Sequence, residues 1–152
     1  LNKKIVEITK ITDDMLVDKK PFNEEVGQKL LYKLINNHED KYFIAHNGDS
    51  FDRIFLKEHF RKVGIDLKSY KFKHIDTLLF ARMMYPNLYR YSLGKLIEKF
   101  KIQTRTGHRA ENDTMMLMDL YIYMCKDLSY RNSKNENYYL QNPQLVYDLI
   151  YH

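Results

Sequence analysis

Two short apolar segments, each followed by polar turn residues and a helical pattern, set the strongest limit on the fold. The first, KYFIAH (41–46), is aromatic and β-branched, and the second, YKFKHIDT (70–77), alternates polar with apolar side chains. Both patterns predict strands. Strands separated by helices indicate an α/β domain in which helices cover a sheet. A sheet of only two strands leaves these helices too little surface to cover, so part of the sheet is missing or unrecognised.

Apolar residues at three- and four-residue spacings predict the helices. They lie within 21–40, 52–65, 78–85, 91–100 and 110–128, and a weaker pattern lies at 144–152. Predicted caps are Asn23, Asp76 with Thr77, and Ser92, while Gly64 and Pro86 are predicted to end helices. The polar stretch that begins at Ser129 predicts a loop or linker. We therefore expect one domain over 1–128 and a C-terminal extension over 129–152.

The composition is that of an ordinary globular protein. The chain has 152 residues, of which 44% are hydrophobic, enough for one domain with a buried core. No apolar run approaches the roughly 20 residues of a membrane-spanning helix, and no signal peptide is evident. The single cysteine, Cys125, lies in a helical pattern and is expected in the core; it suits a reducing compartment. The net charge of +5 favours a polyanionic partner, with a generic basic surface as the alternative.

The stretch AHNGDSFDRIF (45–55) connects a predicted strand to a predicted helix. Asp52 lies at the start of that helix, where α/β sheets present ligands because strand ends and helix N-termini face the same crevice. A helix cap is the alternative interpretation of Asp52. For Asn47, the alternative is a turn residue that bonds its own backbone.

A second polar stretch, GHRAEND (107–113), precedes and opens the longest predicted helix. His108 lies in the loop and Asp113 one turn into the helix, so both side chains can project toward the same end of the domain. Taken alone, His108 is equally well explained as a partial cap or a surface group.

Together the two stretches resemble the DEDDh superfamily of 3′-to-5′ exonucleases, which includes RNase T and the epsilon subunit of bacterial DNA polymerase III and has a ribonuclease H-like fold. The segments HIDTLLFAR (74–82) and YSLGKLIEKF (91–100) resemble those between the family's motifs, and ITKITDDML (8–16) resembles an upstream stretch, with Lys10 in place of glycine. The matching motif positions are Ala45, His46, Asn47, Phe51, Asp52, Ile54, Phe55 and Leu56, followed by His108, Ala110 and Asp113.

The family's first motif, an aspartate and a glutamate separated by one residue on a central strand, has no counterpart in this sequence. Glu7 stands where the family's third strand would end. The resemblance therefore implies a fold truncated at its N-terminus, with the first three strands missing. That absence would explain why only two strands are evident.

The resemblance also implies roles for individual residues. Catalysis in this family is thought to use two divalent ions, Mg²⁺ or Mn²⁺, which prefer oxygen ligands. By resemblance, Asp113 binds the first ion directly, Asp52 holds the second partly through water, and His108 is the general base for the attacking water. The missing aspartate and glutamate would bridge the two ions. Asn47 and Phe51 support Asp52 and the terminal nucleotide. His46 contacts the substrate or is packed at the end of the strand.

Two further groups of side chains have open interpretations. Tyr85, Tyr89 and Tyr91 alternate with Arg82 and Arg90. They are suited to stacking on bases and meeting phosphates, or they form a plain packed surface. A methionine stripe, Met115, Met116, Met118 and Met124, is expected in the core or at an interface.

The expected function is a 3′-to-5′ exonuclease that acts at the 3′ end of DNA or RNA and releases 5′-mononucleotides. The alternative is a catalytically incomplete paralogue that acts as a nucleic-acid-binding or protein-interaction module, because two of the family's four carboxylates are missing. An intracellular, cytoplasmic protein without membrane contacts is expected, from a bacterium or a virus with low-GC DNA. Oligomeric state and the choice between DNA and RNA stay open.

Overall fold

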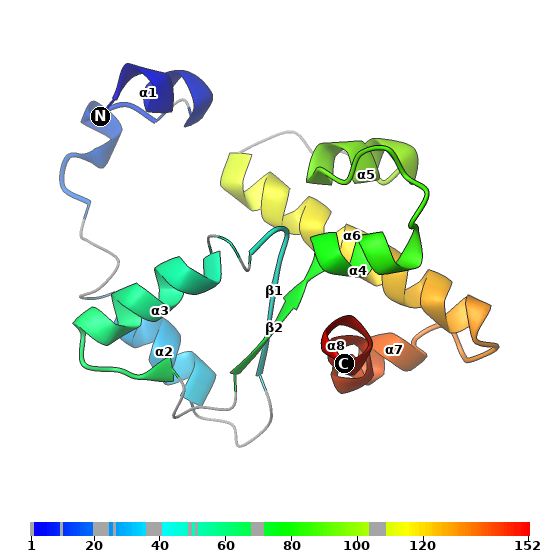
Figure 1. Ribbon diagram of the computed structural model, residues 1–152. Helices are drawn as coiled ribbons and strands as arrows, with labels where there is room; N and C mark the ends of the chain where they lie inside the picture. The colour runs from blue at the N-terminus through cyan, green and yellow to red at the C-terminus, as the bar shows by residue number, and fades with distance from the viewer. Residues whose placement is uncertain are drawn as a thin grey trace.

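The computed structural model describes residues 2–9, 11–19, 25, 27–35, 41–48, 50, 52–67, 72–103 and 109–152. Its sheet consists, within these residues, of β1 (Lys41–Ala45) and β2 (Phe72–Asp76), which run parallel (Figure 1). Ala45 lies opposite Asp76, so both strands end at the same edge of the sheet. Both predicted strands are confirmed, and the mixed α/β architecture agrees with an exonuclease-like fold.

Each strand leads into a helix whose ends follow from local residues. After β1 the chain turns into α3 (Asp52–Lys62), and β2 continues directly into α4 (Thr77–Met84). The Asp76 carboxylate caps α4 by accepting the Leu78 amide at 2.9 Å. Gly64 follows α3 with φ of 76°, the left-handed conformation that glycine adopts without a steric cost. These predicted boundaries are confirmed.

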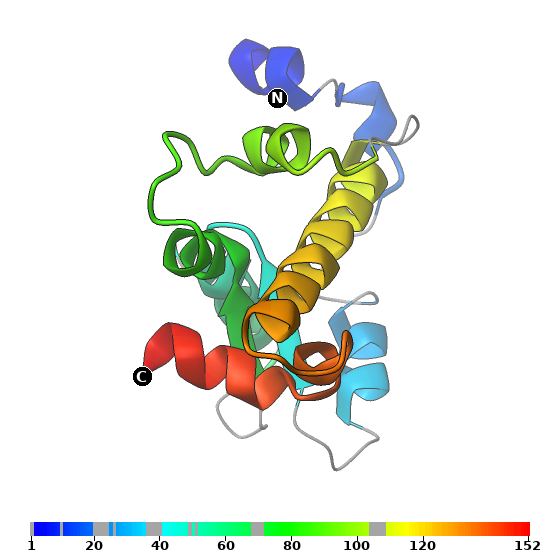
Figure 2. The same cartoon turned by 90° about the vertical axis from the view of Figure 1, so that its right-hand side faces the viewer.

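The main core lies against one face of the sheet. It is formed by α4, α5 (Leu93–Lys99), α6 (Arg109–Arg131), α7 (Tyr138–Gln141) and α8 (Pro143–Tyr151) (Figures 1 and 2). From the sheet, Ile75 is buried in this core, and Tyr42 and Ile44 pack against it. Its other buried members are Phe80, Ala81, Met84, Leu96, Ile97, Leu120, Tyr121, Met124, Cys125, Leu128, Tyr139 and Val146. The core position predicted for Cys125 is confirmed, and burial raises the pKa of its thiol to about 12.

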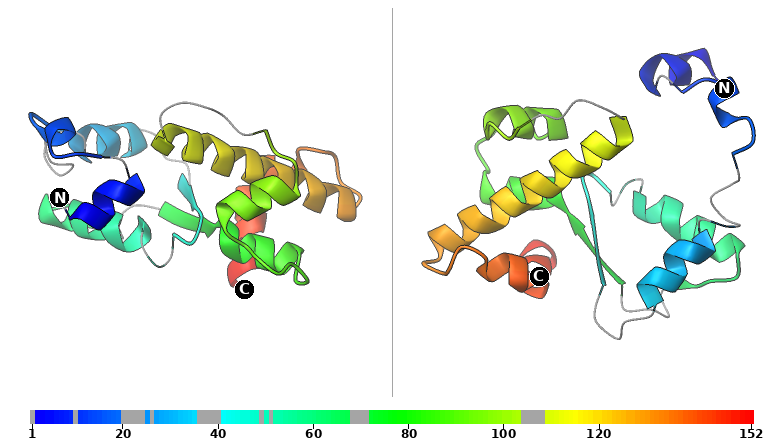
Figure 3. Two further views of the ribbon diagram at one scale, coloured as in Figure 1. Left: turned by 90° about the horizontal axis from the view of Figure 1, so that it is seen from above. Right: turned by 180° about the vertical axis from the view of Figure 1, so that it is seen from behind.

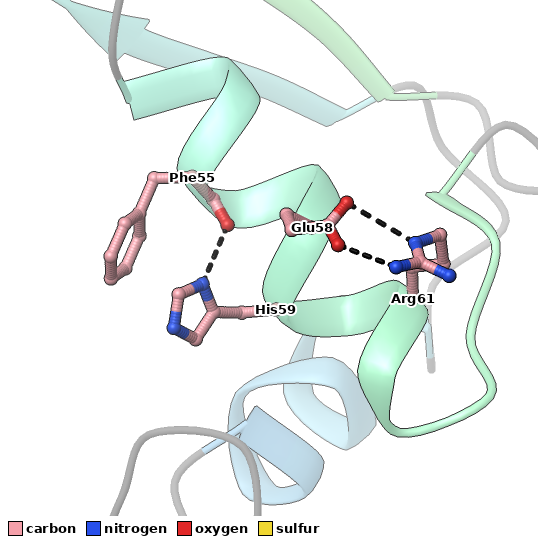
Figure 4. Close-up of polar contacts among 4 residues, drawn as sticks. All are labelled: Phe55, Glu58, His59 and Arg61. Atoms are coloured by element: carbon pink, nitrogen blue, oxygen red, sulfur yellow. Dashed lines mark hydrogen bonds and ion pairs between the residues drawn. The ribbon is translucent and has the colours of Figure 1, made fainter.

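The opposite side of the sheet carries α3 and, beside it, α2 (Gly27–Ile35) (Figure 3). Phe43 and Phe72 pack there with their ring centroids 5.1 Å apart. Along α3, Arg61 pairs with Glu58 at 2.5 Å, and His59 Nδ1 lies 2.9 Å from the Phe55 carbonyl oxygen (Figure 4). Contacts between residues three or four positions apart lie on one side of a helix and stabilise it.

The N-terminal segment differs from the expectation drawn from the resemblance. Residues aligned with the end of the family's third strand form α1 (Lys3–Thr9), so Glu7 lies exposed on a helix. A short 3₁₀ turn, η1 (Asp14–Leu16), follows it. A lone strand leaves its backbone N–H and C=O groups without partners, whereas a helix satisfies most of them internally. A strand at Glu7 is therefore wrong for this structure.

The loop expected from Ser129 is also wrong at its start, because α6 continues to Arg131. Ser129 is fully buried, and its hydroxyl oxygen lies 3.5 Å from the Tyr139 amide. Arg131 bonds Asp127 at 2.8 Å, one helical turn back. The predicted helix near the C-terminus is confirmed as α8, while α7 was not predicted. The domain boundary after residue 128 stays a prediction.

Several other expectations meet the structure only in part. Asn23 and the start of the helix predicted within 21–40 lie outside the described residues. Ser92 occupies the N-cap position of α5, but in the described residues its side chain makes no capping hydrogen bond. Of the methionine stripe, Met124 is buried, whereas Met115 and Met118 are exposed. None of the described helices has the length and apolar content that crossing a membrane requires.

Candidate functional site

The turn between β1 and α3 is held by a buried carboxylate from the neighbouring strand end. Asp76, 2% exposed, accepts the Asn47 amide at 2.9 Å as well as the Leu78 amide that it caps. Asn47 has φ of 61°, a left-handed conformation that asparagine tolerates better than most residues. The Asp76 carboxylate thus bonds a residue after β1 and a residue after β2, and so holds the turn after β1 against the start of α4.

His46 is bonded on both sides of its ring. Nε2 lies 2.8 Å from the Tyr91 carbonyl oxygen, and Nδ1 lies 3.0 Å from Thr77 Oγ1. The carbonyl can only accept, so Nε2 carries a proton. The Thr77 hydroxyl also lies 3.1 Å from the Ala45 carbonyl oxygen, and its single proton can serve only one of these acceptors at a time. When the ring is neutral, this hydroxyl is shared between Nδ1 and the Ala45 carbonyl.

Burial lowers the pKa of His46 from its ordinary value. The bond to the Tyr91 carbonyl and the negative charge of Asp76 oppose that shift in part. The packed role that the sequence left open for His46 fits these contacts, and its role in substrate binding stays a prediction.

Gly48 lets the backbone of the turn pack closely against Ala45 and His74, where a larger residue would collide with them. A Cβ placed there would lie 2.4 Å from Ala45 Cβ and 2.7 Å from His74 Nε2. The Gly48 carbonyl accepts the Arg53 amide at 2.9 Å, which joins the turn to the first residues of α3. This tight turn determines where α3 begins relative to the end of β1, and so where its first residue, Asp52, lies.

Asp52 and Asp113 line the same cavity, which has a volume of about 380 Å³. They arrive there from different helices, Asp52 from α3 and Asp113 from α6. In Figure 1 the N-terminal end of α6 lies near the first turn of α3, beside the end of β1. The other lining residues are Phe43, Ile44, Ala45, His46, Leu56, His74, Leu93, Thr114 and Leu117. The structure thus brings together the two carboxylates that the sequence singled out.

One flank of α6 faces this cavity. Asp113 and Leu117 are four residues apart, so they lie on the same side of the helix, with Thr114 beside them. The Thr114 hydroxyl donates back to the Ala110 carbonyl at 2.8 Å. Asp113 and Thr114 are exposed, as is Asp52, so their oxygens are accessible to a bound group.

The remaining predicted site residues are placed less fully. His108 and Phe51 lie outside the described residues, so their roles stay predictions. Asn47 is exposed, and its side-chain oxygen accepts the Ser50 hydroxyl at 3.3 Å, a local turn contact. Sequence reasoning identified Asp76 as a helix cap but missed its bond to the Asn47 amide. The pattern HIDT indicated the cap, but the bond to Asn47 left no signal in the sequence, because its donor is a backbone amide.

The described carboxylates fit a divalent ion in part. Asp52 and Asp113 offer the oxygen ligands that Mg²⁺ and Mn²⁺ prefer, and Mg²⁺ is commonly held by one or two carboxylates together with water and substrate phosphates. Within the described ranges, no group of three or more His, Cys, Asp or Glu side chains is arranged to hold a metal ion. Both carboxylates therefore face a cavity in which water and substrate phosphate would have to supply the remaining ligands of an ion.

Comparisons with known proteins agree with the resemblance to the exonuclease family. The model of a family described as Exonuclease matches residues 1–121. The chain is 34% identical to the PolC-type DNA polymerase III of Bacillus subtilis over 149 residues, which cover 90% of this chain and 9% of that polymerase. It is 36% identical to the PolC-type DNA polymerase III of Mycoplasma genitalium over 128 residues, which cover 83% of this chain and 8% of that polymerase. The chain thus spans less than a tenth of the length of these relatives.

Proposed function

The chain belongs to the exonuclease family, within the DEDDh superfamily, and on that premise we propose that it hydrolyses phosphodiester bonds at a 3′ end and releases 5′-mononucleotides. The proposal includes the finer fold assignment, a ribonuclease H-like sheet completed by further strands and an Asp-x-Glu segment. The family match supports that assignment, and so does the two-stranded sheet of the described residues, which is small for the helices around it.

The observation that carries the proposal is the common cavity of Asp52 and Asp113. These residues are far apart in the sequence and belong to different motifs. Their cavity also contains Ala45, the last residue of β1, and the ends of parallel strands are where α/β folds present ligands.

The chain's own residues have distinct tasks in this reaction. Asp52 and Asp113 would hold the divalent metal beside the terminal phosphate. His108 accepts a proton from the attacking water, whose oxygen bonds to phosphorus while the 3′ oxygen of the preceding nucleotide leaves. Two divalent ions, when bound, would activate that water and stabilise the leaving oxygen. The turn containing Asn47 and Phe51 supports the terminal nucleotide.

We propose DNA as the preferred substrate, because the similar bacterial proteins are DNA polymerases. Within such a polymerase the reaction would remove a nucleotide from the primer end. Parallel assays on DNA and RNA strands of one sequence test this preference. Faster release from the RNA strand would contradict it.

The experiment that tests the proposal measures mononucleotide release from a 3′-labelled strand. It uses the longest natural polypeptide that contains this sequence, with Mg²⁺ or Mn²⁺ present. We expect chelator-sensitive release that falls by at least about 100-fold in Asp52→Asn, in Asp113→Asn and in His108→Ala, because each removes a group of the reaction centre.

Glu111→Gln is the matched control. Glu111 is exposed on α6 two residues before Asp113, and residues at that spacing do not face the same side of a helix. It should retain full activity. Release that survives chelation, or that is the same in Asp113→Asn as in Glu111→Gln, would overturn the proposal.

A second candidate function is a nucleic-acid-binding module that does not cut. The described residues offer two carboxylates and no larger metal-binding group, which favours this alternative. It predicts binding of single-stranded nucleic acid that weakens steeply with salt, and no chelator-sensitive release under any metal. Binding without salt dependence would exclude it.

A further inference from the structure

The segment from Arg82 to Lys101, which includes the end of α4, the connection to α5 and α5 itself, is strongly basic. Its basic side chains are Arg82, Arg90, Lys95, Lys99 and Lys101, against a single acidic side chain, Glu98. All six are exposed. The segment therefore carries a net charge of +4, compared with +5 for the whole chain.

The three tyrosines of the connection behave differently from one another. Tyr85 and Tyr91 are half-buried, and both pack against the main core. Tyr89 is 93% exposed, and the guanidinium carbon of Arg90 lies 5.7 Å from the centre of its ring. The packed surface that the sequence left open therefore holds for two of these tyrosines and is wrong for Tyr89.

The connection between α4 and α5, drawn in green in Figure 2, is fixed by several hydrogen bonds of its side chains. The Tyr85 hydroxyl donates to Asp127 at 2.7 Å, and the Tyr91 hydroxyl donates to the Tyr85 carbonyl at 2.6 Å. The Tyr91 carbonyl is held in turn by His46. An aromatic ring displayed on an anchored segment loses little conformational entropy when it binds a ligand.

Tyr89 and Arg90 share an open depression with side chains of α5. Its volume is about 670 Å³, and it is lined by Leu88, Tyr89, Arg90, Lys95, Glu98 and Lys99. Glu98 pairs with Lys95 at 2.5 Å, so the excess charge of the depression comes from Arg90 and Lys99. The depression thus combines an exposed aromatic ring with a net positive charge.

The depression and the cavity that contains Asp52 and Asp113 are connected by one short segment of chain. Leu88, Tyr89 and Arg90 line the depression, and Leu93, the first residue of α5, lines the cavity. The Tyr91 carbonyl, two residues after Tyr89, bonds His46 of that cavity. The chain that displays Tyr89 and Arg90 therefore continues directly into the wall of the cavity.

We propose that this basic aromatic surface, Leu88–Arg90 with Lys95 and Lys99, binds the single-stranded nucleic acid that leads into the cavity. The inference rests on the proposed function, because it takes the cavity to hold the 3′ end. Tyr89 stacks on a base, while Arg90 and Lys99 contact the phosphates on either side. Stacking on an exposed ring together with phosphate contacts is the usual way in which proteins bind single strands without reading their sequence.

The test is a binding titration of the chain with a fluorescent single-stranded DNA in the presence of a chelator, so that nothing is hydrolysed. Tyr89→Ala should weaken binding by at least about fivefold, since one stacked base is lost. Tyr89→Phe, which keeps the ring, should restore it. The matched control is Tyr130→Ala, because Tyr130 is 84% exposed but lies on α6 near its C-terminal end.

The phosphate contacts are tested by the salt dependence of the same titration. Replacing Lys99 with Gln should reduce the slope of log affinity against log salt by about 0.7, the value for one phosphate contact on a single strand. Lys62→Gln is the control, because Lys62 is exposed at the end of α3 and outside this surface. A blunt duplex, whose bases are not free to stack on Tyr89, should bind more weakly than the single strand.

The inference is overturned if Tyr89→Ala binds as the unchanged chain does, if the duplex binds equally well, or if the chain does not bind single strands at all. Equal, Tyr89-independent binding of polyglutamate would assign the surface to an acidic protein instead. These results are separate from the fate of the proposed function. If binding depends on Tyr89 but no mononucleotide is released, the exonuclease proposal fails and the binding surface stands. If release occurs and Tyr89→Ala does not affect it, the binding surface fails and the exonuclease proposal stands.

Discussion

At the scale of single residues, the candidate site depends on Gly48, because the turn after β1 has no room for a side chain at that position. Replacing Gly48 with Ala would bring a methyl group within 2.4 Å of Ala45 Cβ. We expect the free energy of unfolding to fall by about 1–3 kcal/mol, the usual cost of overpacking. Chemical denaturation measures this change.

The matched control is Gly94→Ala, in α5, where a new Cβ meets no atom within 4 Å. There the substitution should stabilise the chain by about 0.5–1 kcal/mol, because alanine loses less conformational freedom in a helix. Equal effects at the two glycines would show that the turn is not as tight as described.

His46 makes the site sensitive to pH. Its folded-state pKa lies below the ordinary 6.5, mainly because burial disfavours the charged ring. The unfolded chain therefore binds more protons below pH 6.5, and the stability that the neutral ring contributes is lost as the pH falls through the folded pKa. The chain should be less stable at pH 5.5 than at pH 7.5.

His46→Gln should reduce this pH dependence, because glutamine does not titrate in that range. Denaturation of both proteins at the two pH values gives the comparison, and proton NMR gives the pKa directly. A pKa for His46 above 6.5 would contradict the stated direction.

At the scale of secondary-structure elements, Asp76 joins the end of β2 to the turn after β1. Asp76→Ala removes the acceptor of the Asn47 and Leu78 amides, and should cost about 2–4 kcal/mol as a lost cap plus an unsatisfied amide. Asp76→Asn keeps an acceptor oxygen and should cost less than about 1.5 kcal/mol. Denaturant unfolding distinguishes the two.

Asp76→Asn has a second expected effect, since it removes a negative charge that raises the pKa of His46. The pKa of His46 should therefore fall further in this variant. If Asp76→Asn were as damaging as Asp76→Ala, the charge and not the acceptor oxygen would be what holds the turn.

The elements were largely predictable because their signals are local. The strands and the ends of α3 and α4 follow from apolar spacing, Gly64, Asp76 and Pro86, which act through neighbouring residues. The prediction failed at Glu7, where a strand would require partners that the described residues do not provide, and at Ser129, a polar residue that is buried on an apolar helix face.

The site was predictable only where motifs mark it. Asp52 and Asp113 were expected to act together because the family resemblance assigns both of them to the metal site. The bonds of His46 to Thr77 and to the Tyr91 carbonyl had no signal, because a backbone acceptor leaves no trace in residue type. Likewise, the exposure of Tyr89 depends on how the connection between α4 and α5 folds.

At the scale of the whole molecule, the C-terminal helices contribute to the same core as the helices around the sheet. Val146 of α8 is fully buried in the main cluster, and Gln144 accepts the Tyr42 hydroxyl of β1 at 2.8 Å. Val146→Ala should therefore destabilise the chain by about 1–3 kcal/mol, through lost burial and the cavity that remains.

Leu149, on the same helix, is 47% exposed and provides the control. Leu149→Ala should cost less than about 1 kcal/mol. Thermal unfolding of both variants in a single transition is the expected result. If Val146→Ala left the main transition unchanged and melted a separate one, residues 129–152 would be an independent unit.

The central claim is that Asp52 and Asp113 hold one divalent cation between α3 and α6. The most direct test is paramagnetic broadening of amide NMR signals by Mn²⁺ at substoichiometric concentration. The account predicts that amides at the start of α3 and around Asp113 broaden together, and that Asp52→Asn and Asp113→Asn each abolish both effects while Glu111→Gln abolishes neither. Broadening at only one of the two helices, or broadening that survives either aspartate substitution, would contradict it.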